Sequence, residues 1–301
     1  MGARPAFRLG RWCVVTCTAC GHGLTDPRPS PEELQALYDR DAYYGERGME
    51  APEDLTPHHA LLDGLLPWLP GPSLLDVGAG TGGLLAAASQ RGLRVTGTEY
   101  SREAAGHAAE RFGLPLRVGA FGEGQFGRDE RFHGVTFIHV LEHLPDPAAA
   151  LRLARRLLEP GGTVYVVVPN RASVAARFVP REAHRTYDLP YHLHHFTPES
   201  LERMIGAAGL DLVELWPSLP ESARRVLGWA AAAKRRMRRT PDPLALGGDG
   251  AARPPDGARE GRPEGAGLAT PPRASVGARL VGWLRAVLPG GTITAIARAP
   301  R

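Results

Sequence analysis

The sequence has very little lysine, few cysteines and no long apolar segment. Lys234 is the one lysine among 36 basic residues, so arginine supplies nearly all of the positive charge. Because the chain is also rich in alanine, glycine and proline, this bias is typical of a GC-rich coding sequence. The basic pI of 9.2 is therefore no argument for a nucleic-acid partner. Three cysteines, Cys13, Cys17 and Cys20, are too few and too clustered for a disulfide framework.

No apolar run approaches the ~20 residues that a membrane-spanning helix needs. The N-terminus also lacks the apolar core that marks a signal peptide. We therefore expect a cytoplasmic protein. Its charge is uneven, because residues 1–220 carry 21 basic and 26 acidic residues whereas residues 221–301 carry 15 and 6.

The middle of the chain alternates between strand-like and helix-like patterns. Residues 94–99 have a strand pattern, and Ser101 can cap the helix that follows them. Residues 163–168 are a β-branched apolar run, as expected of a central strand buried on both faces of a parallel sheet. This alternation predicts a doubly wound α/β sheet over residues 71–216. The remaining segments are expected to be a cysteine-containing segment (1–30), two helices (31–70), an insertion (217–290) with basic amphipathic helices at 221–239 and 278–288 around a disordered linker (241–275), and a final strand (291–301).

A glycine-rich loop joins the first predicted strand to its helix. Gly78, Gly80 and Gly83 match the fingerprint of NAD(P)-type dinucleotide-dependent oxidoreductases, and Glu99 ends the next strand, where a carboxylate can accept ribose hydroxyls. Asp76 argues for another cofactor, since its carboxylate would repel a pyrophosphate. It suits S-adenosylmethionine, which carries an ammonium and a sulfonium.

Here the chain resembles the class I S-adenosylmethionine-dependent methyltransferases. The resemblance rests on Asp76-Val77-Gly78-Ala79-Gly80, on Leu141-Glu142-His143-Leu144, on Glu159-Pro160-Gly161-Gly162 and on His194-His195-Phe196-Thr197, which occur in the family's order. It implies a Rossmann-like seven-stranded sheet whose last strand, here residues 292–297, is antiparallel beside the fifth. It further implies that Asp76, Gly78, Gly80 and Gly82 line the methionine and ribose parts of the cofactor, Glu99 binds the ribose, Tyr100, Ala120 and Phe121 meet the adenine, and His139 lies near the methionine end.

Two positions depart from the family's pattern. The acid that often follows the third strand is absent until Glu123, and the usual Phe-Asp pair before the fourth strand is Phe132-His133. We expect neither departure to abolish cofactor binding.

Histidines accumulate at the predicted edge of the sheet. His139, Glu142 and His143 have a spacing that places them on one side of a helical turn, and His192, His194 and His195 lie in a loop that could fold over the same edge. Either His143 or His194 is a candidate base that takes a proton from the acceptor. Alternatively, His139, Glu142 and His143 hold a divalent cation, as a similar Glu-x-x-Glu-His element does in quinone-biosynthesis O-methyltransferases, or these side chains are structural.

The cysteines match a zinc knuckle. Cys17 and Cys20 are candidate metal ligands in Cys17-x-x-Cys20-Gly21-His22, and one branch of the resembled family begins with two such knuckles. Only one is present here, so residues 1–30 are expected to be a knuckle remnant. The spacing with Cys13 also matches a radical S-adenosylmethionine motif, but that class builds a different barrel fold.

The sequence thus predicts a methyltransferase that acts by direct displacement on a substrate oxygen or nitrogen. The resemblance favours O-methylation of a small molecule or of a glycan- or lipid-linked precursor. A non-catalytic cofactor-binding scaffold remains an alternative. The two basic amphipathic segments, 221–239 and 278–288, are candidates for peripheral contact with an anionic membrane at its inner face.

Overall fold

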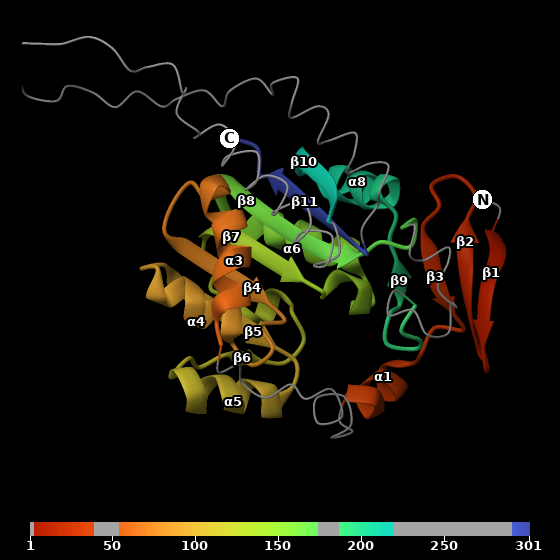
Figure 1. Cartoon of the computed structure of the whole chain (residues 1–301), viewed down its shortest axis with the longest axis horizontal. Helices are drawn as coiled ribbons and strands as arrows, with labels where there is room; N and C mark the ends of the chain where they lie inside the picture. The colour runs from red at the N-terminus through yellow and green to blue at the C-terminus, as the bar shows by residue number, and fades with distance from the viewer. Residues whose placement is uncertain (1–2, 39–53, 174–186, 219–290) are drawn as a thin grey trace, which may run out of the picture. The chain divides into compact units, whose positions relative to one another are not determined.

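The computed structural model describes residues 3–38, 54–173, 187–218 and 291–301 (Figure 1). These residues belong to one compact unit, which comprises residues 1–219 and 284–301. The predicted segments 221–239, 241–275 and 278–288 lie outside the described residues.

The central sheet has seven strands in the order β6-β5-β4-β7-β8-β11-β10. Neighbouring strands are parallel from β6 to β8, and β11 is antiparallel to both β8 and β10. This topology confirms the predicted fold class, including a C-terminal strand beside the fifth strand. The bounds are β4 (Ser73–Val77), β5 (Arg94–Glu99), β6 (Arg117–Val118), β7 (Phe132–Ile138), β8 (Leu158–Pro169), β10 (Asp211–Ser218) and β11 (Thr292–Arg298).

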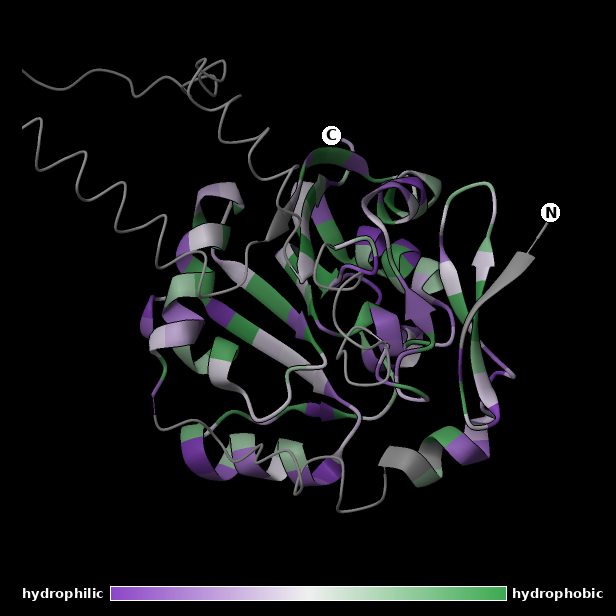
Figure 2. Ribbon diagram, turned by 45° about the vertical axis from the view of Figure 1, so that its right-hand side comes forward, coloured by the Kyte–Doolittle hydropathy of each residue, from purple (hydrophilic) through white to green (hydrophobic). Residues whose placement is uncertain are grey.

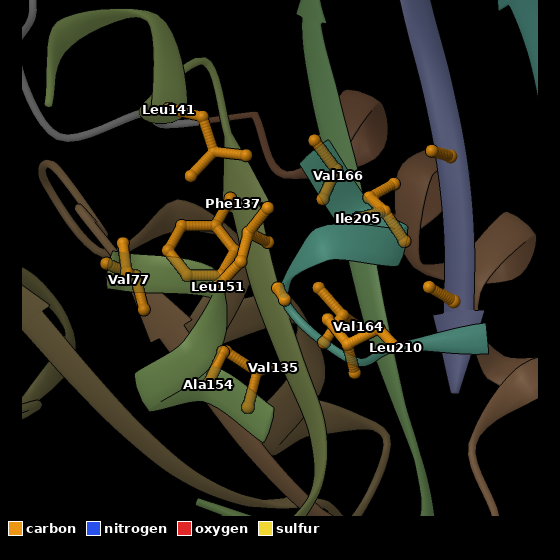
Figure 3. Packing of buried hydrophobic residues seen from close by; sticks show 14 of the residues in the cluster. Val77, Val135, Phe137, Leu141, Leu151, Ala154, Val164, Val166, Ile205 and Leu210 are labelled. Atoms are coloured by element: carbon orange, nitrogen blue, oxygen red, sulfur yellow. The ribbon is translucent and has the colours of Figure 1, made fainter. Parts of the chain in front are cut away.

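Helices cover both faces of this sheet because its strands are apolar on both sides (Figure 2). Leu74 belongs to a buried cluster with side chains of α3 (Thr56–Leu65) and α4 (Gly83–Gln90). Its neighbour Leu75 points the other way, into a cluster with α6 (Pro147–Leu157) and α8 (Pro198–Ala207), part of which Figure 3 shows. α5 (Arg102–Phe112) follows β5. The described residues also include three short 3-10 turns: η1 (Leu66–Trp68), η2 (Glu123–Gln125) and η3 (Leu141–His143).

Helix ends follow the local chemistry of the sequence. Ser101 Oγ accepts a hydrogen bond from Ala104 N at 3.2 Å at the start of α5, and Gly113, with a φ of 67°, ends that helix in a left-handed conformation. Thr197 caps α8 in the same way as Ser101. The Ser101 cap confirms the predicted start of the helix that follows residues 94–99.

The N-terminal residues form a second sheet that the sequence analysis did not predict. Strands β1 (Ala3–Leu9), β2 (Trp12–Cys17) and β3 (Gly23–Asp26) are antiparallel, and β9 (His194–His195) adds a fourth strand beside β3. Residues 1–30 were predicted to be a knuckle remnant only. The turn from Cys17 to His22 joins β2 to β3 within this sheet, and α1 (Pro31–Tyr38) follows.

In the part of the chain that the structure describes, no helix has the length and apolarity to cross a bilayer.

Candidate active site

The glycine loop turns sharply between β4 and α4. Gly78, Gly80 and Gly82 all have positive φ angles, which side chains other than glycine rarely adopt. A Cβ on Gly78 would lie 2.6 Å from Val140 Cγ2, so glycine is also required there by the packing of the loop that follows β7. The loop thus presents its backbone, rather than side chains, at the carboxyl edge of the sheet.

Glu99 fixes this loop from the end of β5. Its Oε2 accepts a hydrogen bond from Gly80 N at 2.8 Å, and its Oε1 accepts one from Ser101 N at 2.8 Å. Each carboxylate oxygen can accept more than one hydrogen bond. The carboxylate is therefore held in place by the protein and retains acceptor capacity for ribose hydroxyls.

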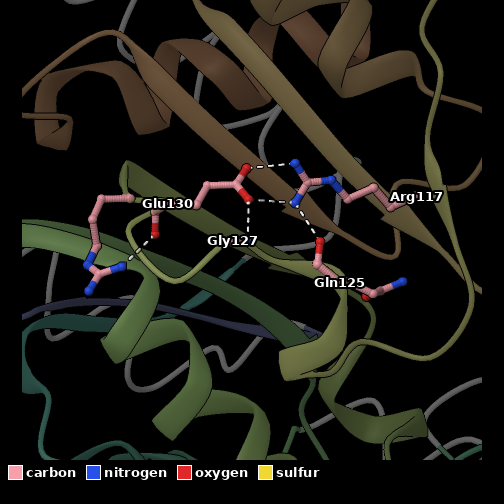
Figure 4. A network of polar contacts seen from close by, with 5 residues as sticks. Arg117, Gln125, Gly127 and Glu130 are labelled. Carbon is pink, nitrogen blue, oxygen red and sulfur yellow. Dashed lines mark hydrogen bonds and ion pairs between the residues drawn. The ribbon is translucent and has the colours of Figure 1, made fainter.

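A bidentate ion pair orders the loop after β6, which carries Ala120 and Phe121. Arg117 donates to both carboxylate oxygens of Glu130, at 3.0 and 2.6 Å, and also to Gln125 O at 2.9 Å (Figure 4). The hydrogen bond from Arg117 lowers the pKa of Glu130, so this pair stays ionised. Phe121 packs edge-on against Phe137 of β7, with ring centroids 5.8 Å apart.

A cavity of about 910 Å³ lies between the glycine loop, the end of β5 and the loops that follow β6 and β7. Six of the predicted cofactor-binding residues line it: Gly78, Glu99, Tyr100, Ala120, Phe121 and His139. Asp76, Gly80 and Gly82 do not line it. Sequence reasoning missed the walls that come from elsewhere in the chain. They are Pro31 and Leu34 of α1, Val140, Leu144 and Pro145 after β7, and Glu123, Arg152 and Arg156, of which Glu123 and Arg156 form an ion pair at 3.2 Å.

Asp76 is almost completely buried on the α3–α4 face of β4. Burial raises the pKa of its carboxyl to about 7, the hydrogen bond from Thr136 Oγ1 at 2.5 Å opposes this, and the nearby Glu99 charge adds to it. The carboxyl is therefore close to half-protonated at neutral pH without a cation beside it. A cofactor ammonium would favour the ionised form.

We expect the stability of the protein to fall as Asp76 loses its proton. The pKa is raised from 3.8 to about 7, so the stabilising contribution is complete below pH 3.8 and is lost as the pH rises through 7. The difference corresponds to at most about 4 kcal/mol. Urea unfolding of the wild type and of Asp76→Asn between pH 5 and 8 measures it. The variant should gain stability relative to the wild type as the pH rises, and a constant difference would contradict the assignment.

His139, Glu142 and His143 lie together at the end of β7, as the spacing predicted. His139 has a φ of 56°, a strained conformation for a residue other than glycine, and its Nδ1 lies 3.3 Å from Glu142 Oε1. Glu142 is fully buried, and its Oε2 has no hydrogen-bond partner among the described residues. Burial alone would raise the pKa of Glu142, but the hydrogen bond from His139 and the neighbouring imidazoles outweigh it and keep the carboxyl ionised.

His143 lines the cavity and is held from the far side of its ring. Its Nδ1 lies 3.0 Å from Tyr191 O, which can only accept, so Nδ1 carries the proton and Nε2 carries the lone pair. Burial lowers the pKa of His143 to about 4, against the opposing effect of Glu142. The imidazole is therefore neutral at pH 7 and can accept a proton at Nε2.

The later loop does fold over this edge, and it contributes His192. Glu142, His143 and His192 each place a ligand atom within 4.8 Å of the other two. The sequence predicted His139, Glu142 and His143 as ligands of a divalent cation. The structure instead groups Glu142 and His143 with His192. Two imidazoles and a carboxylate with an unpartnered oxygen fit a divalent cation.

His194 does not line the cavity. Its Nδ1 lies 3.0 Å from His22 Nε2, and its Nε2 lies 3.1 Å from Arg28 NH2. Burial and the neighbouring His22 and Arg28 lower its pKa to about 3. Because both ring nitrogens face the N-terminal sheet, this geometry argues against the prediction that His194 is a proton acceptor.

The cysteines do not form a closed metal site within the described residues. Cys17 and Cys20 share the turn between β2 and β3, and hydrogen bonds from the amides of Ala19 and Cys20 lower the pKa of Cys17. Cys13 is four residues away along β2, about 13 Å at the rise of a strand. His22 is engaged with His194 and Ser200. The turn therefore offers two thiols, without the third and fourth ligands that structural zinc requires.

The Phe132-His133 departure has a structural reason. His133 Nδ1 lies 2.6 Å from Ser73 Oγ, so the imidazole joins β7 to the start of β4 and lies outside the residues that line the cavity.

Comparison with known proteins agrees with this arrangement. A family model described as a methyltransferase domain matches residues 49–215, more than half of the chain. A ubiquinone biosynthesis O-methyltransferase of Xanthomonas campestris is 30% identical over 223 residues, which cover 65% of this chain and 91% of that protein. An enzyme of the same name from Aeromonas salmonicida is 32% identical over 157 residues, covering 46% of this chain but only 63% of its own length.

A solved methyltransferase structure shows the same fold. The S-adenosylmethionine-dependent methyltransferase of Archaeoglobus fulgidus superimposes with a TM-score of 0.51 at 16% identity, over 85% of this chain and 99% of that one. The chain is therefore a class I S-adenosylmethionine-dependent methyltransferase. It belongs to the methyltransferase-domain family, and this excludes the oxidoreductase alternative for its glycine loop.

Proposed function

We propose that this methyltransferase transfers the methyl group of S-adenosylmethionine to an oxygen of a small-molecule acceptor. The observation that carries the proposal is one cavity that Glu99 lines at the end of β5 and His143 lines after β7. The Glu99 carboxylate can accept hydrogen bonds from the ribose of the cofactor, and the His143 imidazole can accept the proton that an acceptor hydroxyl loses. The names of the Xanthomonas and Aeromonas relatives support an oxygen acceptor on a small molecule.

The cofactor would be held by backbone and carboxylate groups. Glu99 accepts the ribose hydroxyls, the backbone at Gly78 approaches the cofactor closely, and Tyr100 and Phe121 flank the adenine. His139 and, from beneath the loop, Asp76 and its glycines serve the methionine end. Bound S-adenosylmethionine supplies an electrophilic methyl group. The protein contributes mainly by holding that group and the acceptor at reacting distance.

His143 Nε2 accepts the proton that the acceptor hydroxyl releases as its oxygen attacks. The Nδ1–H donated to Tyr191 O keeps the ring in the tautomer that this step needs. The neighbouring Glu142 carboxylate stabilises the imidazolium that results.

A second candidate mechanism uses a divalent cation on Glu142, His143 and His192, and the unpartnered Glu142 Oε2 favours it. In that mechanism the cation would lower the pKa of the acceptor hydroxyl. Turnover that is lost with a chelator and restored by added metal would select it, whereas turnover indifferent to chelator would leave His143 as the base.

Cofactor binding is expected to depend on Glu99. In Glu99→Gln one carboxylate oxygen becomes an amide nitrogen, a donor that faces either Gly80 N or Ser101 N and can no longer accept from the ribose. Hydrogen bonds to a charged acceptor contribute about 1.5–3 kcal/mol, so affinity for S-adenosylhomocysteine should fall about 10- to 100-fold. Calorimetry measures it, with Glu103→Gln, an exposed carboxylate on α5, as the matched control. Equal affinities in both variants would remove Glu99 from the site.

An acceptor panel tests the activity itself. Hydroxylated aromatic quinol precursors follow from the names of the relatives, and hydroxylated glycan- or lipid-linked precursors from the sequence resemblance. The measured product is S-adenosylhomocysteine, with acceptor omitted as the control. Formation of methyl ether on a quinol precursor supports the proposal, and cofactor binding without turnover on any acceptor favours the scaffold alternative.

The domain division and the membrane contact also remain proposals. We propose a core over 71–216 and 291–301 with 217–290 inserted, and peripheral membrane contact through 221–239 and 278–288, both of which lie outside the described residues. Co-sedimentation with anionic vesicles at low salt tests the contact. Protein that stays in the supernatant would exclude it.

A further inference from the structure

The N-terminal sheet contacts the loop that packs against His143. β3 pairs with β9 through Gly23 opposite His195 and Leu24 opposite His194. Two arginines add to this contact, because Arg28 NH1 donates to Pro145 O at 2.9 Å and Arg171 NH2 donates to Thr16 Oγ1 at 3.0 Å. Residues about 170 positions apart in the chain are thereby joined at the cavity edge.

Thr25 of β3 makes the most buried of these contacts. Its side chain is 1% exposed. Its backbone N donates to Leu193 O at 3.0 Å, and its hydroxyl donates to His192 O at 2.6 Å. The hydroxyl has one proton and donates it to His192 O. In the contact between Thr25 Oγ1 and His195 Nε2 at 3.0 Å, His195 must therefore be the donor. Thr25 therefore holds the loop at three residues, His192, Leu193 and His195.

The same loop residues hold the proposed catalytic group. Tyr191 O accepts from His143 Nδ1, and Leu193 N donates to Glu142 O at 2.7 Å. The His192 ring packs edge-on against the His143 ring, with centroids 4.7 Å apart. A displacement of residues 191–193 would therefore move His143 and His192 relative to the cavity.

We propose that Thr25 is a positioning residue for methyl transfer, and that the N-terminal sheet serves to hold His143 and His192 in place through it. The inference rests on the proposed role of His143 at the cavity. Residues 3–30 would then have a positioning role, and this role requires no metal at the turn that carries Cys17 and Cys20. Threonine is suited to this position, since valine has the same shape and lacks the hydroxyl that His192 O and His195 Nε2 both use.

The first test follows the His143 ring by NMR, because that measurement needs no acceptor. The groups that face this ring are Glu142 from η3, and Asp188, His192 and the Tyr191 carbonyl from the loop. In Thr25→Val the loosened loop exposes the His143 Nδ1–H that Tyr191 O accepts, so exchange of this proton with solvent at a fixed neutral pH should speed up about tenfold or more. Thr25→Ser keeps the hydroxyl and should exchange as slowly as the wild type does. His143→Gln identifies the signal.

Thr16→Val is the matched control. It makes the same substitution on the neighbouring strand and removes the hydrogen bond to Arg171, but within the described residues Thr16 makes no hydrogen bond to residues 191–193. It should leave the exchange rate of the His143 Nδ1–H unchanged although it loosens the same sheet. An unchanged exchange rate in Thr25→Val, or an equal change in Thr16→Val, would overturn the proposal.

The second test is kinetic and is made on the full chain once the acceptor panel gives turnover. Thr25→Val should lower kcat about 10- to 100-fold, because small misplacements of a catalytic group are costly, while KM for the cofactor and affinity for S-adenosylhomocysteine stay within twofold. Thr25→Ser should recover most of kcat. Wild-type kcat in Thr25→Val would contradict the inference, whereas absent turnover in the wild type would refute the proposed function and leave the NMR test to decide on Thr25.

Discussion

Removing residues 291–301 is expected to unfold the central sheet, although none of these residues lines the cavity. β11 is hydrogen-bonded to β8 on one side and to β10 on the other, so its loss leaves two strand edges unpaired. Ile293 and Ile296 are fully buried in the clusters on opposite faces of the sheet. Burial of two isoleucines contributes about 3–6 kcal/mol, a large part of the roughly 5–15 kcal/mol that stabilises a typical domain.

Soluble yield, far-UV circular dichroism and urea unfolding measure this effect. The matched control is deletion of residues 241–275, which contain 7 prolines and 7 glycines and no aromatic residue. That deletion should leave the midpoint nearly unchanged, because the entropy of closing a long chain segment changes only slowly with its length. A truncated chain that melts cooperatively near the wild-type temperature would contradict the assigned place of β11.

His143→Ala is expected to reduce turnover about 10²- to 10⁴-fold, the usual contribution of a positioned general base. Affinity for S-adenosylhomocysteine should stay close to that of the wild type. Because burial lowers the pKa of His143 to about 4, its basic form is present throughout the neutral range, and wild-type kcat should fall only at strongly acidic pH. Single-turnover rates at saturating cofactor separate this effect from binding.

His107→Ala is the control for this experiment, since His107 is an exposed histidine on α5 outside the cavity lining. It should retain full turnover. Full turnover in His143→Ala as well would exclude His143 as base. A comparable loss in His192→Ala, together with sensitivity to chelator, would instead favour the cation mechanism on Glu142, His143 and His192.

The sequence predicted the central sheet well because several local signals agree there. Residues 94–99 form β5 as predicted, since their strand pattern is followed directly by the Ser101 cap. The placement of β11 required the family resemblance as well, because seven residues of alternating pattern do not specify a partner more than 120 residues earlier.

Two features of the site could not be predicted from local patterns. The N-terminal sheet depends on β9, a partner of two residues that carries no periodic signal of its own. The separate environments of His143 and His194 depend on which elements pack against each ring. The spacing of the histidines shows that both can lie at one edge of the sheet. Only the fold shows that the two ring nitrogens of His194 contact His22 and Arg28.

The pairing of β10 with β11 has a consequence for synthesis of the protein. Ser218 and Thr292 lie opposite each other in register, so the residues between them occupy the position of a hairpin loop. At about 5–20 residues per second, a ribosome needs roughly 4–15 s to make residues 219–290. During that interval β8 has emerged while the strand that must lie between it and β10 does not yet exist. Abundant chaperones should therefore raise the yield of folded enzyme, and a short turn in place of 219–290 should remove the delay.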